Sequence, residues 1–72
     1  MSPLLAIIAD RIAEDFGISR ADISGPRRYH PLPNARTAMV RKARRLGYTQ
    51  RALAKALNRS IDGIRYAERR AA

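Results

Sequence analysis

Hydrophobic residues recur at helical spacing along most of this chain, and the pattern predicts helices rather than strands. The first segment has one apolar face, flanked by Leu5 and Ala9, whose members stand four residues apart: Leu4, Ile8, Ile12 and Phe16. Ser2 followed by Pro3 is typical of a helix start, and Gly17 is typical of a helix end. A helix is therefore predicted between these two signals.

The rest of the chain predicts a short helical turn and three longer helices, over Ser19–Ser24, Ala35–Leu46, Gln50–Leu57 and Ile61–Arg70. Residue types that cap helix N-termini precede the three longer helices: Asn34, Thr49 and Ser60. Gly47 and Asn58 follow two of these helices, and both residue types tolerate the left-handed conformation that ends a helix. The predicted inward positions are Ala35, Ala38, Met39, Ala43 and Leu46, then Leu53, Ala54 and Leu57, then Ile64 and Ala67.

The segment Gly25–Pro33 interrupts this pattern. Its glycine and three prolines are incompatible with a continuous helix or strand. Arg27, Arg28 and His30 stand among them, so the segment is predicted to be a stiff, basic loop. His30 is the only histidine, and we expect it to be a loop residue rather than a metal ligand or a catalytic base.

The chain has 72 residues, which is enough for one hydrophobic core. Thirteen of its hydrophobic residues are alanine and only 6% of all residues are aromatic, so this core must be thin. Close-packed helices suit a thin core better than a sandwich or a barrel does. We therefore expect a single all-α domain, a small bundle of about five helices.

The formal net charge is +9, and it is unevenly distributed. Residues 1–24 carry two arginines and four carboxylates (net −2), whereas residues 25–72 carry 13 basic and two acidic residues (net +11). Thirteen of the 15 basic residues are arginine, whose planar guanidinium suits phosphate oxygens and guanine edges. Residues 25–72 are therefore predicted to face a polyanion.

Several classes of protein do not fit this sequence. It has no cysteine, which excludes disulfides and thiolate metal sites, and no apolar run long enough to cross a bilayer. The apolar stretch Leu4–Ala9 is short and is followed by an acidic residue, unlike a signal peptide. The carboxylates are scattered, and no glycine-rich phosphate-binding motif occurs. We expect a cytoplasmic protein that is not an enzyme and has no catalytic residue, metal or cofactor.

Residues 49–70 have the spacing of a helix-turn-helix motif. Two short helices that cross steeply need a small residue at their contact and a turn that reverses the chain. Ala54 is the small residue, Asn58 occupies the turn, and Ile64 packs the second helix against the first. Arg59 departs from the pattern, because the position after the turn is usually apolar. A plain helical hairpin is the alternative, but the basic residues around the second helix favour DNA binding.

In such a motif the start of the second helix enters the major groove, where its side chains reach base edges. Arg65 is suited to guanine, Ile61 to a thymine methyl group, and Asp62 to a cytosine amino group. Ser60 and Tyr66 lie on the same predicted face. The alternative for Asp62 is an acidic residue favoured by the dipole of the first helical turn.

Other basic residues also have two interpretations. Arg27 and Arg28 could reach into a minor groove, as basic arms do, or could merely add charge to a solvated loop. The outer face of the helix predicted over 35–46 carries Arg36, Arg41, Lys42, Arg44 and Arg45. The last four of these could bind phosphates or could form a solvated helix face.

Several short motifs stand in the order known from one family of DNA-binding domains: Glu14–Ile18, Ala21–Ile23, Arg27–Arg28, Ala35–Arg36, Ala38–Met39, the helix-turn-helix to Ile64, and Ala67, Arg69 and Arg70. On these residues the chain resembles the C-terminal domain of the bacterial replication initiator DnaA, a Trp-repressor-like fold. The resemblance implies that Arg28 enters a minor groove and that Arg44 meets a phosphate. It implies DNA-backbone contacts by Thr49, Gln50 and Arg51. The family's base-reading Asp-His-Thr-Thr falls on Ser60, Ile61, Asp62 and Gly63, none of which keeps the family residue.

We therefore expect sequence-selective binding of double-stranded DNA, with the helix-turn-helix in the major groove and the basic loop in the minor groove. The resemblance implies transcription regulation, as by the DNA-binding part of a phage-related activator, and association with the bacterial nucleoid. The open alternatives are replication-origin binding without an ATPase, RNA binding, and a basic surface for a protein partner such as the transcription machinery. We expect a monomer, because the apolar residues are all needed for the buried faces of the helices. Only Leu32 is left as a candidate for an interface with a second copy.

Overall fold

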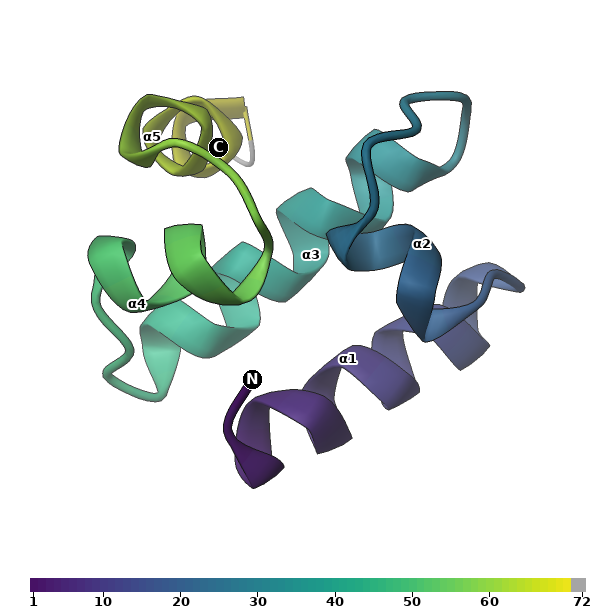
Figure 1. Cartoon of the computed structure of the whole chain (residues 1–72), viewed down its shortest axis with the longest axis horizontal. Helices are drawn as coiled ribbons and strands as arrows, with labels where there is room; N and C mark the ends of the chain where they lie inside the picture. Colours follow the sequence, from purple (N-terminus) through teal and green to yellow (C-terminus); the bar gives the residue numbers. More distant parts are fainter. Residues whose placement is uncertain (71–72) are drawn as a thin grey trace.

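The computed structural model describes residues 1–70, so Ala71 and Ala72 of the predicted domain lie outside this part. Five helices follow one another along the described residues: α1 (Pro3–Phe16), α2 (Arg20–Ser24), α3 (Leu32–Arg45), α4 (Gln50–Ala56) and α5 (Ile61–Arg70). Residues 1–70 contain no strand. The predicted all-α bundle is thus confirmed (Figure 1).

Most helix ends follow their local sequence signals. The side-chain oxygens of Ser2, Ser19, Thr49 and Ser60 each accept a hydrogen bond from the backbone N–H three residues later, at 3.0 to 3.2 Å. These bonds satisfy N–H groups that have no partner within the first turn of a helix. Gly17 ends α1 with a φ of 68°, a left-handed conformation that costs glycine little. The predicted helix ends at Ser2, Gly17, Thr49 and Ser60 are confirmed, and Ser19 caps α2 rather than lying within it.

The start of α3 differs from the prediction. The helix begins at Leu32, not at Ala35, and no side chain caps it. Pro33 lies within its first turn, where a missing N–H costs nothing because that group would have no partner in the helix. Asn34 is therefore not the N-cap; its side-chain oxygen instead accepts a hydrogen bond from Arg70 Nη2 at 2.8 Å. This contact ties the end of α5 to the start of α3.

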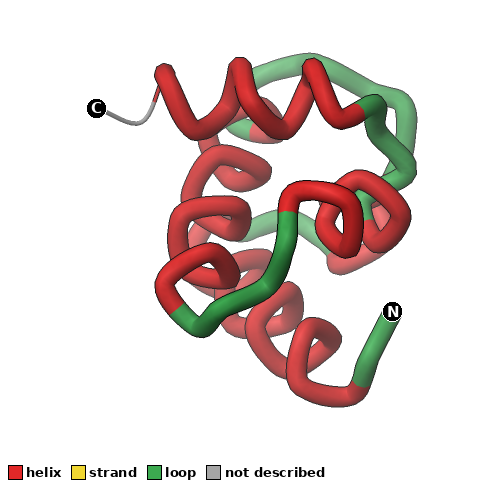
Figure 2. The backbone as a smooth tube through the Cα atoms, turned by 90° about the vertical axis from the view of Figure 1, so that its left-hand side faces the viewer, coloured by secondary structure: helices red, strands yellow, loops and turns green. Residues whose placement is uncertain are grey.

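The core lies where α3 meets the other helices. Helix α1 packs along α3, α2 bridges these two, and α5 contacts both α3 and α4. Helices α1 and α5 lie at opposite ends of the molecule, with α3 running between them (Figures 1 and 2). The largest fully buried side chains come from α2 to α5 and the adjoining turn: Ile23, Leu32, Met39, Val40, Leu53, Leu57 and Ile64.

The expectation that the internal stripes use every apolar residue except Leu32 is wrong. Leu32 is fully buried, because α3 begins one turn earlier than predicted. Leu46 is exposed because α3 has ended before it, and on α1 the apolar face turns Leu5 inward and leaves Leu4 and Ile7 at the surface. That the protein is a monomer therefore stays a prediction, and the use of all apolar residues in the core no longer supports it. No helix in residues 1–70 is both long and apolar enough to span a membrane.

Candidate nucleic-acid interface

Helices α4 and α5 form a helix-turn-helix with an apolar seam. The seam consists of side chains that are fully buried: Leu53, Leu57 and Ile64. Ala54 is buried beside them. Asn58 adopts the left-handed conformation, with a φ of 54°, and the N–H of Arg59 donates to the carbonyl of Ala54 at 2.8 Å. The predicted small residue and turn residue are thus where the motif requires them.

The first turn of α5 offers fewer free side chains than the sequence predicts. The hydroxyl oxygen of Ser60 acts as a cap and accepts from the N–H of Gly63 at 3.0 Å, so the hydroxyl is held in place and its O–H is left to donate. Ile61 is half-buried and packs against the core. The side chain of Asp62 is 92% exposed. Ile61 can therefore offer a base only part of its side chain, whereas the carboxylate of Asp62 is open to solvent.

Polar contacts join predicted DNA-binding residues on three helices. Arg65 Nη1 lies 3.5 Å from Asp62 Oδ1, and Arg65 Nε donates to Gln50 Oε1 at 3.3 Å. Gln50 Nε2 donates to the Glu68 carboxylate at 3.5 Å, and Arg44 Nε pairs with the same carboxylate at 2.7 Å. Glu68, which the sequence did not single out, thereby links α3, α4 and α5. A phosphate at Arg44 would have to share that guanidinium with Glu68.

The remaining predicted residues lie at the surface. They are exposed residues of the loop, of the start of α4 and of α5: Arg27, Arg28, Thr49, Arg51 and Tyr66. The hydroxyl oxygen of Thr49 accepts from the N–H of Ala52 as the cap of α4, which leaves its O–H to donate. Of the predicted residues, Arg28, Gly63 and Tyr66 line one pocket between the loop and α5, and the polar contacts above link Arg44, Gln50, Asp62 and Arg65.

Arg36 does not lie on the outer face of α3, as predicted, but is buried, with 8% of its surface exposed. Its Nε donates to the carbonyl of Ile23 at 2.9 Å, and its Nη2 donates to the carbonyls of Asp22 and Gly25 at 2.7 and 2.9 Å. The guanidinium thus satisfies carbonyls at the end of α2 that have no helical partner. A sequence signal was available, because Arg36 stands four residues from both Leu32 and Val40, which are buried.

The contacts of Arg59 explain why a charged residue stands after the turn, at a position that is usually apolar. Its Nη2 donates to the carbonyl of Gly25, and its Nη1 donates to the carbonyls of Leu57 and Asn58 at 3.3 and 3.1 Å. The side chain therefore ties the turn of the helix-turn-helix to the root of the basic loop. Arg36 bonds to the same Gly25 carbonyl, so two arginines hold the loop against the motif.

The guanidiniums of Arg36, Arg59 and Arg28 lie close enough together to repel one another. Burial lowers the pKa of Arg36, and the nearby guanidiniums of Arg59 and Arg28 lower it further, while Asp22 acts in the opposite direction. Burial also lowers the pKa of Arg59, with a further contribution from Arg28. Positive charge is thus concentrated where the loop meets the helix-turn-helix.

Comparison of the chain with protein-family models, with curated proteins and with solved structures finds no match. The similarity to the DnaA domain therefore stays a prediction from the motifs alone.

Proposed function

We propose that this chain binds double-stranded DNA with sequence preference, through α5 in the major groove and the loop over residues 25–31 in a minor groove. The observation that carries the proposal is the helix-turn-helix of α4 and α5, whose buried seam leaves Asp62, Arg65 and Tyr66 exposed. A motif of this kind presents the first turn of its second helix to base edges. The net charge of +11 over residues 25–72 supplies attraction to phosphates.

The contacts of Arg65 are weak enough to exchange for DNA. Its pair with Asp62 is 3.5 Å long, with side chains 56% and 92% exposed. Such surface pairs contribute about 0–1 kcal/mol. A guanine edge offers a bidentate partner for the guanidinium, and a cytosine amino group offers a donor to the carboxylate. Both side chains can therefore leave each other for bases without a large cost to the fold.

The biological role that we propose is transcription regulation. It is suggested by the resemblance to the DnaA domain, in which the corresponding surface binds duplex DNA. Regulation by occupancy of a DNA site requires binding alone, which suits a surface of arginines, one exposed acid and capping hydroxyls. The proposal extends to a monomer on an asymmetric site, since one helix-turn-helix reads one half-site.

Selection of bound duplexes from a random pool tests the proposal directly. We expect one enriched, asymmetric motif. If the bound duplexes stay random in sequence while binding is still measurable, the surface binds DNA without sequence preference. An enriched inverted repeat would contradict the monomer, as would a dimer in solution at micromolar concentration.

Substitutions then separate residues that contact bases from residues that contact phosphates. Arg65→Ala should cost roughly 1–3 kcal/mol on the selected site and little on random DNA. Asp62→Ala should relax the preference while leaving affinity for random DNA unchanged or higher, because it removes an acid that repels phosphates. Arg44→Ala should weaken all duplexes about equally, as the loss of a phosphate contact does. If both substitutions on α5 leave the preference intact, α5 is not the reading helix.

A further inference from the structure

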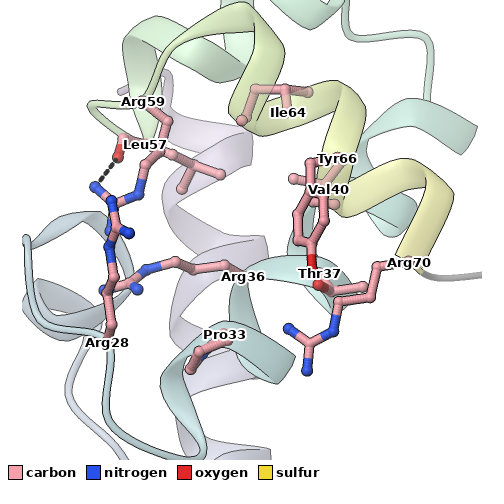
Figure 3. Close-up of a pocket in the computed structure, with 12 residues that line it drawn as sticks. Arg28, Pro33, Arg36, Thr37, Val40, Leu57, Arg59, Ile64, Tyr66 and Arg70 are labelled. Atoms are coloured by element: carbon pink, nitrogen blue, oxygen red, sulfur yellow. Dashed lines mark hydrogen bonds between the residues drawn. The ribbon is translucent and has the colours of Figure 1, made fainter.

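An open cavity of about 400 Å³ lies between the loop over residues 25–31, α3 and α5 (Figure 3). Four arginines from separate parts of the chain line it: Arg28, Arg36, Arg59 and Arg70. None of the described residues that line it is acidic, and much of the remaining wall is apolar, including Val40, Leu57 and Ile64. We call this space the arginine cavity. Positive charge beside an apolar wall is costly unless the charge is paired or hydrogen-bonded.

Three of these side chains converge on one side of the arginine cavity. Figure 3 shows the guanidiniums of Arg28, Arg36 and Arg59 gathered beside the loop, apart from Arg70. Like charges at such positions repel one another most where water is partly excluded. Among the described residues, the carboxylate of Asp22 offsets this repulsion at Arg36. An anion in the cavity would offset this repulsion by attracting the arginines that line it.

The arginines also keep donors that the fold does not use. A guanidinium has five N–H donors. Within residues 1–70, Arg28 makes no hydrogen bond or ion pair, Nη1 of Arg36 has no partner, and Nε of Arg59 has none. Their backbone bonds fix Arg36 and Arg59 in place, so these spare donors are already positioned. Exposed Arg28 can close over a ligand from the side of the loop.

We infer that the arginine cavity binds a phosphate group, held chiefly by Arg28 and Arg59 with the charge of Arg36 behind them. Arginine forks match the paired oxygens of a phosphate, and charge-assisted hydrogen bonds of this kind are about twice as strong as neutral ones. The phosphate can belong to the DNA backbone or to a free phosphate compound. Both sources present the same tetrahedral oxyanion to the same donors.

The DNA source rests on the proposed function. The loop and α5 are proposed to enter a minor and a major groove, and the backbone of one strand separates any two neighbouring grooves. The arginine cavity lies between these two elements, so a phosphate of that strand would face it. Arg28 would then hold the backbone, and Arg27 would enter the minor groove in place of Arg28, to which the resemblance gives that role.

Titration of the DNA-free protein with inorganic phosphate tests the site, with sodium chloride at equal ionic strength as the reference and NMR as the readout. We expect saturable shifts at residues 25–31 and at Arg59 that chloride does not cause. Arg28→Gln should weaken this binding about tenfold, the loss expected for one charge-assisted hydrogen bond. Arg28 is exposed and makes no hydrogen bond or ion pair within residues 1–70, so this variant should remain folded. Arg11→Gln removes the same charge from an exposed residue of α1 outside the cavity, and should leave the phosphate affinity unchanged.

Shifts that never saturate, or equal weakening in both variants, would overturn the site and leave only a general basic surface. Addition of the selected duplex shows whether the bound phosphate group comes from the DNA backbone or from a free phosphate compound. Displacement of inorganic phosphate by the duplex assigns the cavity to the DNA backbone, whereas simultaneous binding assigns it to a free phosphate compound. Saturable phosphate binding by a protein that binds no duplex would reject the proposed function and retain the phosphate site.

Discussion

Removal of the Arg36 guanidinium should unfold this domain far more easily than removal of any exposed arginine. The side chain donates three hydrogen bonds, to the carbonyls of Asp22, Ile23 and Gly25 at 2.7 to 2.9 Å, and the bond to Ile23 is buried. Hydrogen bonds to charged groups contribute about 1.5–3 kcal/mol each. The sum is an upper bound, because the buried guanidinium is itself desolvated and is repelled by Arg28 and Arg59.

We therefore expect Arg36→Ala to lower the free energy of unfolding by about 3 kcal/mol. For a domain of this size such a loss corresponds to a fall in Tm of roughly 12–24 °C. Thermal and urea unfolding followed by circular dichroism measure both quantities. Arg36→Met keeps most of the side-chain volume and should lose nearly as much, which separates hydrogen bonding from packing.

Arg41→Ala is the matched control, since Arg41 is an exposed residue of the same helix. It should change the free energy of unfolding by less than about 0.5 kcal/mol. If Arg36→Ala were no more destabilising than this control, the carbonyls at the end of α2 would be satisfied by water. Arg36 would then not be what holds the basic loop in place.

Two further results are expected. Affinity for a fixed duplex should fall steeply between low and moderate salt, with a log–log slope of about −0.9 per phosphate and about 5–7 phosphates neutralised; a slope near zero in a fluorescence-anisotropy titration would remove nucleic acid as the partner. Ile64→Ala, at a residue only 1% exposed, should lower the free energy of unfolding by about 2–5 kcal/mol, whereas exposed Arg69→Ala on the same helix should be nearly neutral in the same unfolding assay.

The sequence alone determined the helices and most of their ends. Caps such as Ser2 and Thr49 act through backbone groups three residues away, and the apolar spacing of each helix is equally local. The same holds for the turn at Asn58, whose left-handed backbone is a property of one residue. The helix-turn-helix and its buried seam could therefore be predicted, because its two helices adjoin in the chain.

Tertiary structure decided where the charged side chains go. Arg36 and Arg59 bond to the carbonyl of Gly25 from positions 11 and 34 residues away in the chain, and Glu68 gathers Arg44 and Gln50 from two other helices. An arginine can lie in solvent, pair with a carboxylate or donate to backbone carbonyls, and its residue type does not choose among these. The choice depends on which carbonyls and carboxylates the folded chain brings within reach of the guanidinium. For this reason the arginine cavity, unlike the helices around it, exists only in the folded protein.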